Sequence, residues 1–323
     1  MTDEILIKVE ALTRDYGPHR AVDDISFEVR RGEVLGFLGP NGAGKSTTMQ
    51  MITGNLAPTH GRILINGIDI LDKPKQAKAE IGYLPEQPPL YRELTVDEYL
   101  RFCARLNRIA RSQVSQAVNS AKERCGLVAV GKRLIGNLSK GYQQRVGIAQ
   151  AIIHSPAVVV LDEPTVGLDP IQIREIRRLI RELGGSHSVI LSTHILPEVQ
   201  ATCDRVQIIN KGKLVLSDSI EGLTRHMQTS SLLLKLRNAP ALEDIARVPG
   251  IEAVEPCGDG RLRVRHAPES NPAEALADAA VHGGWGLQEL VPERRTLEEI
   301  FVDITTHEAT QEAMQATTEE QAA

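Results

Sequence analysis

One glycine-rich stretch constrains this chain more than any other part of its sequence. It follows the apolar run 33–38, which is typical of a buried strand, and precedes 47–53, a helical pattern that stops at Gly54. A strand, a glycine turn and a helix opening on Gly-Lys-Ser form the setting of a phosphate-binding loop. Glycines let backbone N–H groups turn towards an anion, and a helix N-terminus adds partial positive charge. The loop consists of Gly39, Pro40, Asn41, Gly42, Ala43, Gly44, Lys45, Ser46 and Thr47.

Two side chains of this loop carry the expected chemistry. Lys45 can reach the β- and γ-phosphates of a nucleotide, and the Ser46 hydroxyl can be a ligand of Mg²⁺. A glycine-rich surface turn is the alternative, but it accounts for neither the strand before the loop nor the helix after it. The loop therefore predicts a nucleotide-phosphate site.

Charge divides the chain into two parts. Residues 1–225 hold 29 Lys and Arg against 25 Asp and Glu, whereas 226–323 hold 8 against 17. This asymmetry and the total length predict two domains with a boundary near residue 225, and argue against a nucleic-acid-binding tail. In the second part, 226–305 show a β-α-β-β-α-β pattern, which suggests a small α+β, ferredoxin-like domain. The polar, acidic stretch 306–323 is expected to be disordered.

A second signal lies at the end of another apolar run. The run 157–161 is followed directly by Asp162 and Glu163, which describes a parallel strand buried on both faces that ends in two carboxylates. Ligands bind at this end of the strands in such sheets, and two buried acids need a nearby cation. Asp162 therefore fits a carboxylate associated with Mg²⁺, and Glu163 fits a general base for water.

Three further residues have both an ordinary and a functional interpretation. Tyr16 follows the strand 5–12 and is either a turn aromatic or a platform on which a flat base stacks. Gln87 stands in a proline-rich loop, and is either solvated or positioned to coordinate Mg²⁺ or orient the attacking water. His194 ends the apolar run 188–193, and the phosphate loop and acidic strand favour a γ-phosphate contact over a structural role.

Helical sequence lies between the phosphate loop and the strand that ends in Asp162 and Glu163. A capping box at Thr95–Glu98 opens one helix, and Ser139 can cap another, so 90–150 are expected to form a helical insertion. A second capping box, Thr296–Glu299, predicts a terminal helix. The four cysteines form no CxxC pair, the start lacks the pattern of a signal peptide, and no apolar run could cross a bilayer. We expect a reduced, cytoplasmic chain that reaches a membrane only through a partner.

In this order, the motifs resemble those of the ATP-binding subunits of ABC transporters. Residues 39–47 match Walker A, 158–163 match Walker B, and 138–143 match the signature motif, over a resemblance that covers about 5–220. The residues around the motifs are similar to those of type-2 exporters, particularly the gliding-motility branch, and 226–323 resemble the C-terminal extension of these ATPases. The remaining matches are Tyr16 with the adenine-stacking loop, Gln87 with the Q-loop, Gly167–Asp169 with the D-loop and His194 with the switch histidine.

The resemblance implies a P-loop α/β fold with antiparallel β and helical subdomains, and subunits that close head-to-tail around two MgATP. Ser139 and Gly141 would then meet the ATP bound by the other subunit of a homodimer or heterodimer, and Asp169 would lie at the same interface. Lys140 and Tyr142 depart from the usual signature, Leu-Ser-Gly-Gly-Gln. The implied function is ATP hydrolysis coupled to a transmembrane permease at the inner face of the membrane, with no nucleic-acid partner.

Two rival functions share part of this pattern. A soluble ABC ATPase acting on the ribosome or DNA usually carries paired cassettes or long coiled coils, and this sequence shows neither. A small kinase shares the phosphate loop but has no use for a signature motif placed just before an acidic strand. We therefore expect an exporter ATPase.

Overall fold

The computed structural model describes residues 4–267 and 270–294. Chain contacts divide it into two compact units, with the division between Ile220 and Glu221. The expected boundary near residue 225 lies within a helix that runs through this division, α8 (Ile220–Met227). The predicted terminal helix at Thr296 and the predicted disordered tail at 306–323 lie outside the described residues.

A six-stranded sheet forms the centre of the first unit, in the order β10-β9-β3-β8-β7-β6. Five of its strands run parallel, and only β10 pairs antiparallel, with β9. Residues of β3, β7 and β8 are buried along their whole length, as expected for strands covered on both faces. The strands are β3 (Val34–Leu38), β6 (Ile81–Leu84), β7 (Val158–Asp162), β8 (Ser188–Thr193), β9 (Arg205–Asn210) and β10 (Lys213–Ser219).

A second, antiparallel sheet packs on this core in the order β2-β1-β4-β5. Its first hairpin is longer than the sequence predicted, because pairing continues past the polar residues of the turn region to Tyr16 opposite His19. The predicted turn residue Tyr16 is therefore the last residue of a strand. The strands are β1 (Ile5–Tyr16), β2 (His19–Arg30), β4 (His60–Ile65) and β5 (Ile68–Asp69).

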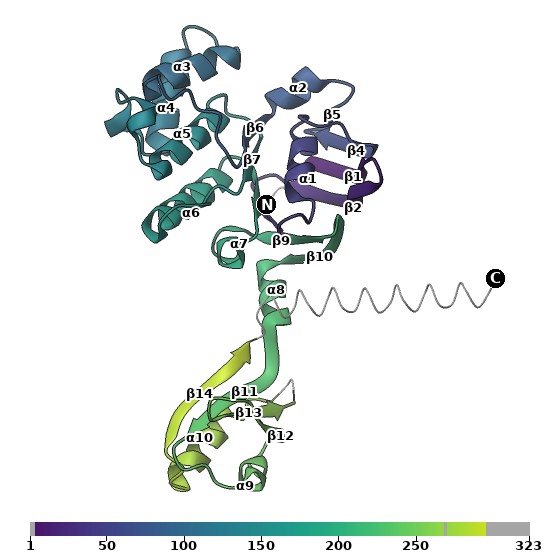
Figure 1. Ribbon diagram of the computed structural model, residues 1–323, viewed down its shortest axis with the longest axis vertical. Helices are drawn as coiled ribbons and strands as arrows, with labels where there is room; N and C mark the ends of the chain where they lie inside the picture. Colours follow the sequence, from purple (N-terminus) through teal and green to yellow (C-terminus); the bar gives the residue numbers. More distant parts are fainter. Residues whose placement is uncertain (1–3, 268–269, 295–323) are drawn as a thin grey trace, which may run out of the picture. The chain divides into compact units, whose positions relative to one another are not determined.

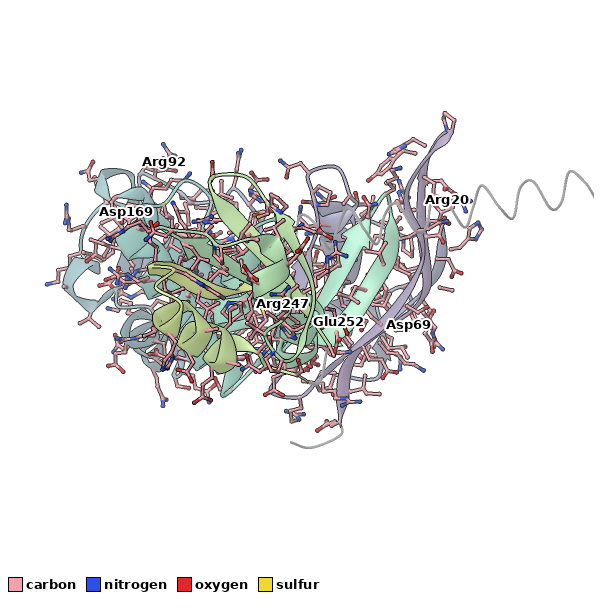
Figure 2. The ribbon with its side chains drawn as sticks, turned by 90° about the horizontal axis from the view of Figure 1, so that it is seen from below. Arg20, Asp69, Arg92, Asp169, Arg247 and Glu252 are labelled. Atoms are coloured by element: carbon pink, nitrogen blue, oxygen red, sulfur yellow. The ribbon has the colours of Figure 1, made fainter. Side chains whose placement is uncertain are left out.

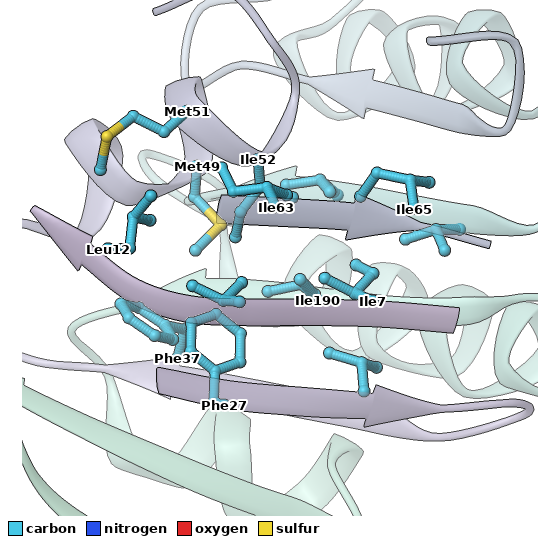
Figure 3. Packing of buried hydrophobic residues seen from close by; sticks show 14 of the residues in the cluster. Ile7, Leu12, Phe27, Phe37, Met49, Met51, Ile52, Ile63, Ile65 and Ile190 are labelled. Carbon is cyan, nitrogen blue, oxygen red and sulfur yellow. The ribbon is translucent and has the colours of Figure 1, made fainter. Parts of the chain in front are cut away.

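The hydrophobic core lies between these two sheets and the helix after the phosphate loop (Figure 3). Phe37 of β3 and Phe27 of β2 contact each other there, with ring centroids 5.6 Å apart. Met49 and Ile52 of α1 (Lys45–Ile52) are fully buried against them. This packing holds the start of α1 at the carboxyl edge of the central sheet.

The helices form two groups. Three of them lie at about 90–150, where a helical insertion was expected, and the last of the three packs against β6 of the central sheet (Figure 1). The capping box at Thr95–Glu98 is present, with Thr95 accepting from the Glu98 N–H and Glu98 accepting from the Thr95 N–H. The helices of the insertion are α3 (Val96–Leu106), α4 (Val114–Arg124) and α5 (Lys140–Ile152), with short 3₁₀ turns at Val128–Val130 and Ile135–Asn137. The remaining helices of the unit are α1, α2 (Pro74–Ala79), α6 (Pro170–Gly184) and α7 (Leu196–Thr202).

Charged side chains of both signs lie on both sides of the first unit. In Figure 2, Arg20 and Asp69 mark the antiparallel sheet, whereas Arg92 and Asp169 mark the helical side. Arg62 forms an ion pair with Asp69 at 2.6 Å on the exposed surface of that sheet.

The second unit has the predicted β-α-β-β-α-β order. Its strands are arranged β12-β13-β11-β14, all antiparallel, which is the ferredoxin-like arrangement. Leu232, Leu234 and Val264 from the sheet pack with Ile245 and Leu276 from the two helices in a separate core. The elements are β11 (Gln228–Leu236), α9 (Leu242–Ala246), β12 (Ile251–Pro256), β13 (Arg261–His266), α10 (Ala273–His282) and β14 (Leu287–Arg294). The predicted fold class, a P-loop α/β core with a small α+β domain, is confirmed.

Candidate functional site

The phosphate loop joins the end of β3 to the start of α1. Gly44 precedes the helix with φ 107°, and a Cβ at this position would lie 2.5 Å from the carbonyl oxygen of Ala21. Gly42 also has a positive φ, 81°, whereas the space around it is open. Only glycine adopts these conformations without strain, so the glycines hold the loop in a shape that another residue would distort.

Lys45 is the first residue of α1 and its side chain is buried. Its ammonium donates to the carbonyl oxygens of Gly39, at 2.8 Å, and Pro40, at 3.1 Å. The same nitrogen lies 3.6 Å from Oε1 of Glu163. The ammonium therefore connects the phosphate loop to the carboxylate that follows β7.

Glu163 is held at the end of β7 in an unusual backbone conformation, with φ 48°. Its N–H donates to the carbonyl oxygen of Ser192 in the neighbouring strand, at 2.8 Å. Both carboxylate oxygens lie 3.0 Å from Nδ1 of His194, so this nitrogen carries the proton and donates it. A non-glycine residue held at positive φ next to a ligand loop is typical of a functional site.

Asp162 lies beside Glu163 and is 3% exposed. Burial raises the pKa of its carboxyl, while the hydroxyls of Ser192 and Ser46 lower this pKa. Its Oδ1 is buried and has no hydrogen-bond partner among the described residues. A buried carboxylate oxygen without a partner, next to a serine hydroxyl of the phosphate loop, fits a divalent cation bound between them.

These elements surround a cleft of about 440 Å³. Tyr16 forms part of its wall and is 45% exposed, and the guanidinium of Arg14, which does not line the cleft, lies 4.8 Å from the centre of the Tyr16 ring. One ring face thus stacks on a cation and the other is available to a flat base. The cleft is lined by Tyr16, His19, Ala21, Asn41, Gly42, Gly44, Lys45, Ser46, Thr47, Glu86, Glu163, Val166 and His194.

The structure does not bring every predicted residue to this cleft. Gln87 is exposed and does not line it, whereas its neighbour Glu86 does. Ser139 caps α5, and Asp169 caps α6 through hydrogen bonds to the N–H groups of Ile171 and Gln172. Neither of them lines the cleft.

The departures from the usual signature motif have contacts of their own. Lys140 approaches Gly167 of the D-loop so closely that a side chain at Gly167 would collide with its ammonium. Gly141 likewise leaves no room for a side chain next to Gln172, at 2.6 Å. Tyr142 is partly exposed, with the Arg145 guanidinium 5.8 Å from its ring centre.

Four residues that line the cleft were not predicted from the sequence, the apolar Ala21 and Val166 and the polar His19 and Glu86. His19 begins β2 opposite Tyr16, and no motif around it indicates a ligand contact. Glu86 precedes the predicted Gln87, and only the conformation of the loop decides which of the two faces the cleft.

Known proteins resemble this chain over most of its length or over about two thirds of it. The uncharacterized ABC transporter ATP-binding protein YxlF of Bacillus subtilis (strain 168) is 32% identical over 301 residues, which cover 93% of this chain and 99% of the relative. The bacitracin transport ATP-binding protein BcrA of Bacillus licheniformis is 41% identical over 212 residues, 65% of this chain and 68% of the relative.

Solved structures resemble about two thirds of this chain. A structure described as the ATP-binding subunit of an ABC transporter superposes with a TM-score of 0.62 at 32% identity, covering 68% of this chain and 92% of that one. CbiO1 of Clostridium perfringens, described as part of the ABC transporter complex CbiONQ, gives 0.63 at 31% identity, covering 68% and 90%. The family profile described as ABC transporter matches residues 22–166, which include the phosphate loop and Glu163. The chain therefore belongs to the family of ABC transporter ATP-binding proteins, and is an ATPase of that family.

Proposed function

We propose that this chain is the ATP-hydrolysing subunit of an exporter, and that two such subunits close around two MgATP to drive a membrane permease. The observation that carries the proposal is the arrangement around Glu163. Its carboxylate contacts both the ammonium of Lys45 and the imidazole of His194 at the edge of the phosphate cleft. A carboxylate in this place has the reach to polarise a water that attacks a bound γ-phosphate.

The negative charge of the nucleotide phosphates determines the roles that we propose for the other site residues. Phosphoryl transfer needs positioning and neutralisation of the phosphates more than covalent help, and Lys45 and the loop N–H groups provide both. Ser46 and Asp162, with Gln87 from its loop, would hold Mg²⁺, which when bound neutralises phosphate charge. Glu163 as general base contributes about 10²–10⁴-fold to the rate.

Closure would bring together the residues that lie outside the cleft of a single subunit. Ser139 is exposed at the N-terminus of α5, and Asp169 caps the N-terminus of α6. A helix N-terminus attracts an anion, so Ser139 and Gly141 suit the phosphates bound by a second subunit. Binding of ATP then favours the closed homodimer or heterodimer, and hydrolysis releases it.

The docking surface for the permease would lie on the helical insertion, near the loop of Gln87. On α3, Phe102 and Leu106 are 42% and 69% exposed, and the ring of Tyr91 lies 5.5 Å from that of Phe102. Exposed apolar residues that cluster on one helix mark a protein interface. Membrane contact would thus pass through the permease, at the cytoplasmic face. Every helix across 4–267 and 270–294 is too short or too polar to span a bilayer.

Export, and a type-2 exporter of the gliding-motility branch in particular, is proposed from the resemblance of the residues around the motifs. The relatives include the bacitracin transport ATP-binding protein BcrA and the probable multidrug ABC transporter ATP-binding protein YbhF of Escherichia coli (strain K12), which is 35% identical over 221 residues, 68% of this chain and 38% of the relative. The alternative function is that of a soluble ABC ATPase that acts on the ribosome or on DNA. Affinity purification from membranes separates the two: a co-purifying multi-spanning protein supports transport, whereas ribosomes or DNA would support the rival.

Glu163→Gln tests the catalytic proposal. The amide keeps the size of the side chain but removes its negative charge and basicity, so hydrolysis should fall by about 10²-fold or more while ATP still binds. The variant should then elute earlier from gel filtration only with MgATP, as a dimer closed around unhydrolysed nucleotide. Hydrolysis at the parental rate would show that Glu163 is not the base.

A further inference from the structure

A buried carboxylate lies behind the site and has no part in the function proposed so far. Glu198 belongs to α7 and is 1% exposed. Its Oε1 accepts a hydrogen bond from the hydroxyl of Thr165, and its Oε2 accepts one from the hydroxyl of Thr193, at 2.9 Å. Nη2 of Arg177, on α6, lies 3.8 Å from Oε1. A carboxylate buried this deeply is costly unless each oxygen has a partner, and here each has one.

The two threonines belong to the segments that carry the catalytic pair. Thr165 follows Glu163 by two residues, and Thr193 directly precedes His194. Both threonines are buried, at 3% and 0% exposure, so neither hydroxyl has solvent as an alternative partner. The Thr193 hydroxyl also accepts from the N–H of Ile195, at 3.1 Å, which fixes the turn that presents His194.

We propose that Glu198 is a positioning residue that clamps the segment of Glu163 to the segment of His194 and so sets the contact between these two side chains. The proposal rests on the proposed function, because it acts through that pair. The ladder of β7 and β8 pairs these segments as far as Asp162 and Ser192, and the Glu163 N–H donates to the Ser192 carbonyl oxygen just beyond it. The bonds of Glu198 add a link between side chains beyond the end of this ladder, in the segments that carry Glu163 and His194. Hydrogen bonds to an ionised carboxylate are shorter and stronger than neutral ones, which suits them to hold a fixed distance.

The expected effect of losing the clamp is kinetic. A displacement of about 1 Å at a reacting group can cost 10²-fold in rate, even when the change lies away from the chemistry. Lys45 and the glycine loop bind the phosphates without help from Glu198, so nucleotide affinity should persist. A carboxylate that only stabilised the fold would instead lower the free energy of unfolding and leave the turnover of folded molecules unchanged.

The test compares substitutions at Glu198 with a control on the same helix. In the full chain, Glu198→Ala should lower kcat for MgATP by at least about tenfold, with KM within about twofold of the parent. Glu198→Gln should restore most of kcat, because its amide can accept from one threonine and donate to the other. Thr202→Val is the control: Thr202 is buried on α7, and its hydroxyl has no partner in the described chain. Its kcat should equal that of the parent.

A double-mutant cycle separates positioning from a structural role. In a His194→Ala background, we measure the rate of hydrolysis in a single turnover. Adding Glu198→Ala should lower this rate by less than about twofold, because the imidazole through which Glu198 acts is gone. Thr193→Val, which keeps shape and removes the hydroxyl, should lower kcat in the parent even if Glu198→Ala fails to fold. The proposal would be overturned if Glu198→Ala lowered the rate by the same factor in the His194→Ala background as in the parent. It would also be overturned if Glu198→Ala and Thr193→Val both kept the parental kcat. Hydrolysis by Glu163→Gln at the parental rate would instead overturn the proposed function.

Discussion

At the residue scale, charge is concentrated on a few buried groups at one edge of the central sheet. Lys45 is 5% exposed and its ammonium has three oxygen neighbours, two carbonyls of its own loop and Oε1 of Glu163. A buried ammonium is stable there because these oxygens replace water. The phosphates of a nucleotide would offer stronger, fully charged partners at the same place. One cation thus serves both the free loop and the bound nucleotide.

This arrangement predicts the effect of Lys45→Ala. Removal of a fixed cation from developing phosphate charge should lower hydrolysis by about 10²–10³-fold, the usual cost of one preorganised donor. The fold should survive, because the core beneath α1 is apolar. ATPase assays with circular dichroism check this, and Lys75→Ala, at an exposed position of α2, is the matched control. Unchanged turnover by folded Lys45→Ala would contradict the role of this residue.

Chemistry carried by a short motif could be predicted from the sequence, whereas chemistry that depends on loop conformation could not. The loop at 39–47 and the pair Asp162 and Glu163 are each local in sequence, and parallel strands of one sheet bring their carboxyl ends to the same edge. The orientation of Glu86 towards the cleft, in place of Gln87, depends on how a proline-rich loop bends. Glu198 is a single acid in a short helix, and only its tertiary contacts distinguish it from a surface residue.

At the element scale, a buried histidine joins the helical insertion to the central sheet. Nδ1 of His187 lies 2.7 Å from the carbonyl oxygen of Pro156, and Nε2 lies 2.9 Å from Nη1 of Arg124, the last residue of α4. Because arginine only donates, Nε2 accepts, and the proton of the neutral ring is on Nδ1. Burial lowers the pKa of His187, and the charge of Arg124 lowers it further against the opposing bond to Pro156. Burial likewise lowers the pKa of His154.

These shifts predict how stability depends on pH. Both histidines have a lower pKa when folded than the value of about 6.5 in an unfolded chain, so below that pH the unfolded chain binds more protons. Their contribution is complete above pH 6.5 and is lost as the pH falls towards the folded values. The loss is at most about 1.4 kcal/mol per pH unit for each histidine.

Urea unfolding at pH 7.5 and 5.5 measures this dependence. His187→Gln should weaken the dependence on pH, because the substituted side chain does not titrate, although the variant is less stable overall. His60→Gln, at an exposed position of β4, is the matched control and should behave as the parent. An equal pH dependence in His187→Gln and the parent would show that His187 contributes nothing to it.

At the scale of the whole molecule, the two units have separate hydrophobic clusters among the residues that the structure describes. The first is built from the two sheets and α1, and the second from four strands and two helices between 228 and 294. The predicted site residues all fall in the first unit, and the charge asymmetry between 1–225 and 226–323 reflects the same division. The strand order of the second unit could be predicted because each of its elements has a clear pattern between glycine or proline turns. The expected boundary near residue 225 and the division between Ile220 and Glu221 both fall within α8.

A shortened chain tests whether the first unit is a complete nucleotide-binding module. A chain that ends after Met227 keeps α8 whole, whereas a chain ending at residue 225 would cut it. Because the phosphate loop, Tyr16, Glu163 and His194 all precede this end, the shortened chain should bind a fluorescent ATP analogue within about twofold of the full chain, a difference below about 0.4 kcal/mol. The full chain with Lys45→Ala is the control for weakened binding.

If the second unit regulates closure or contacts the permease, the shortened chain should differ from the full chain in MgATP-dependent dimerisation or in its recovery with the permease. A folded, soluble chain ending at Met227 that fails to bind the analogue would show that the second unit completes the site.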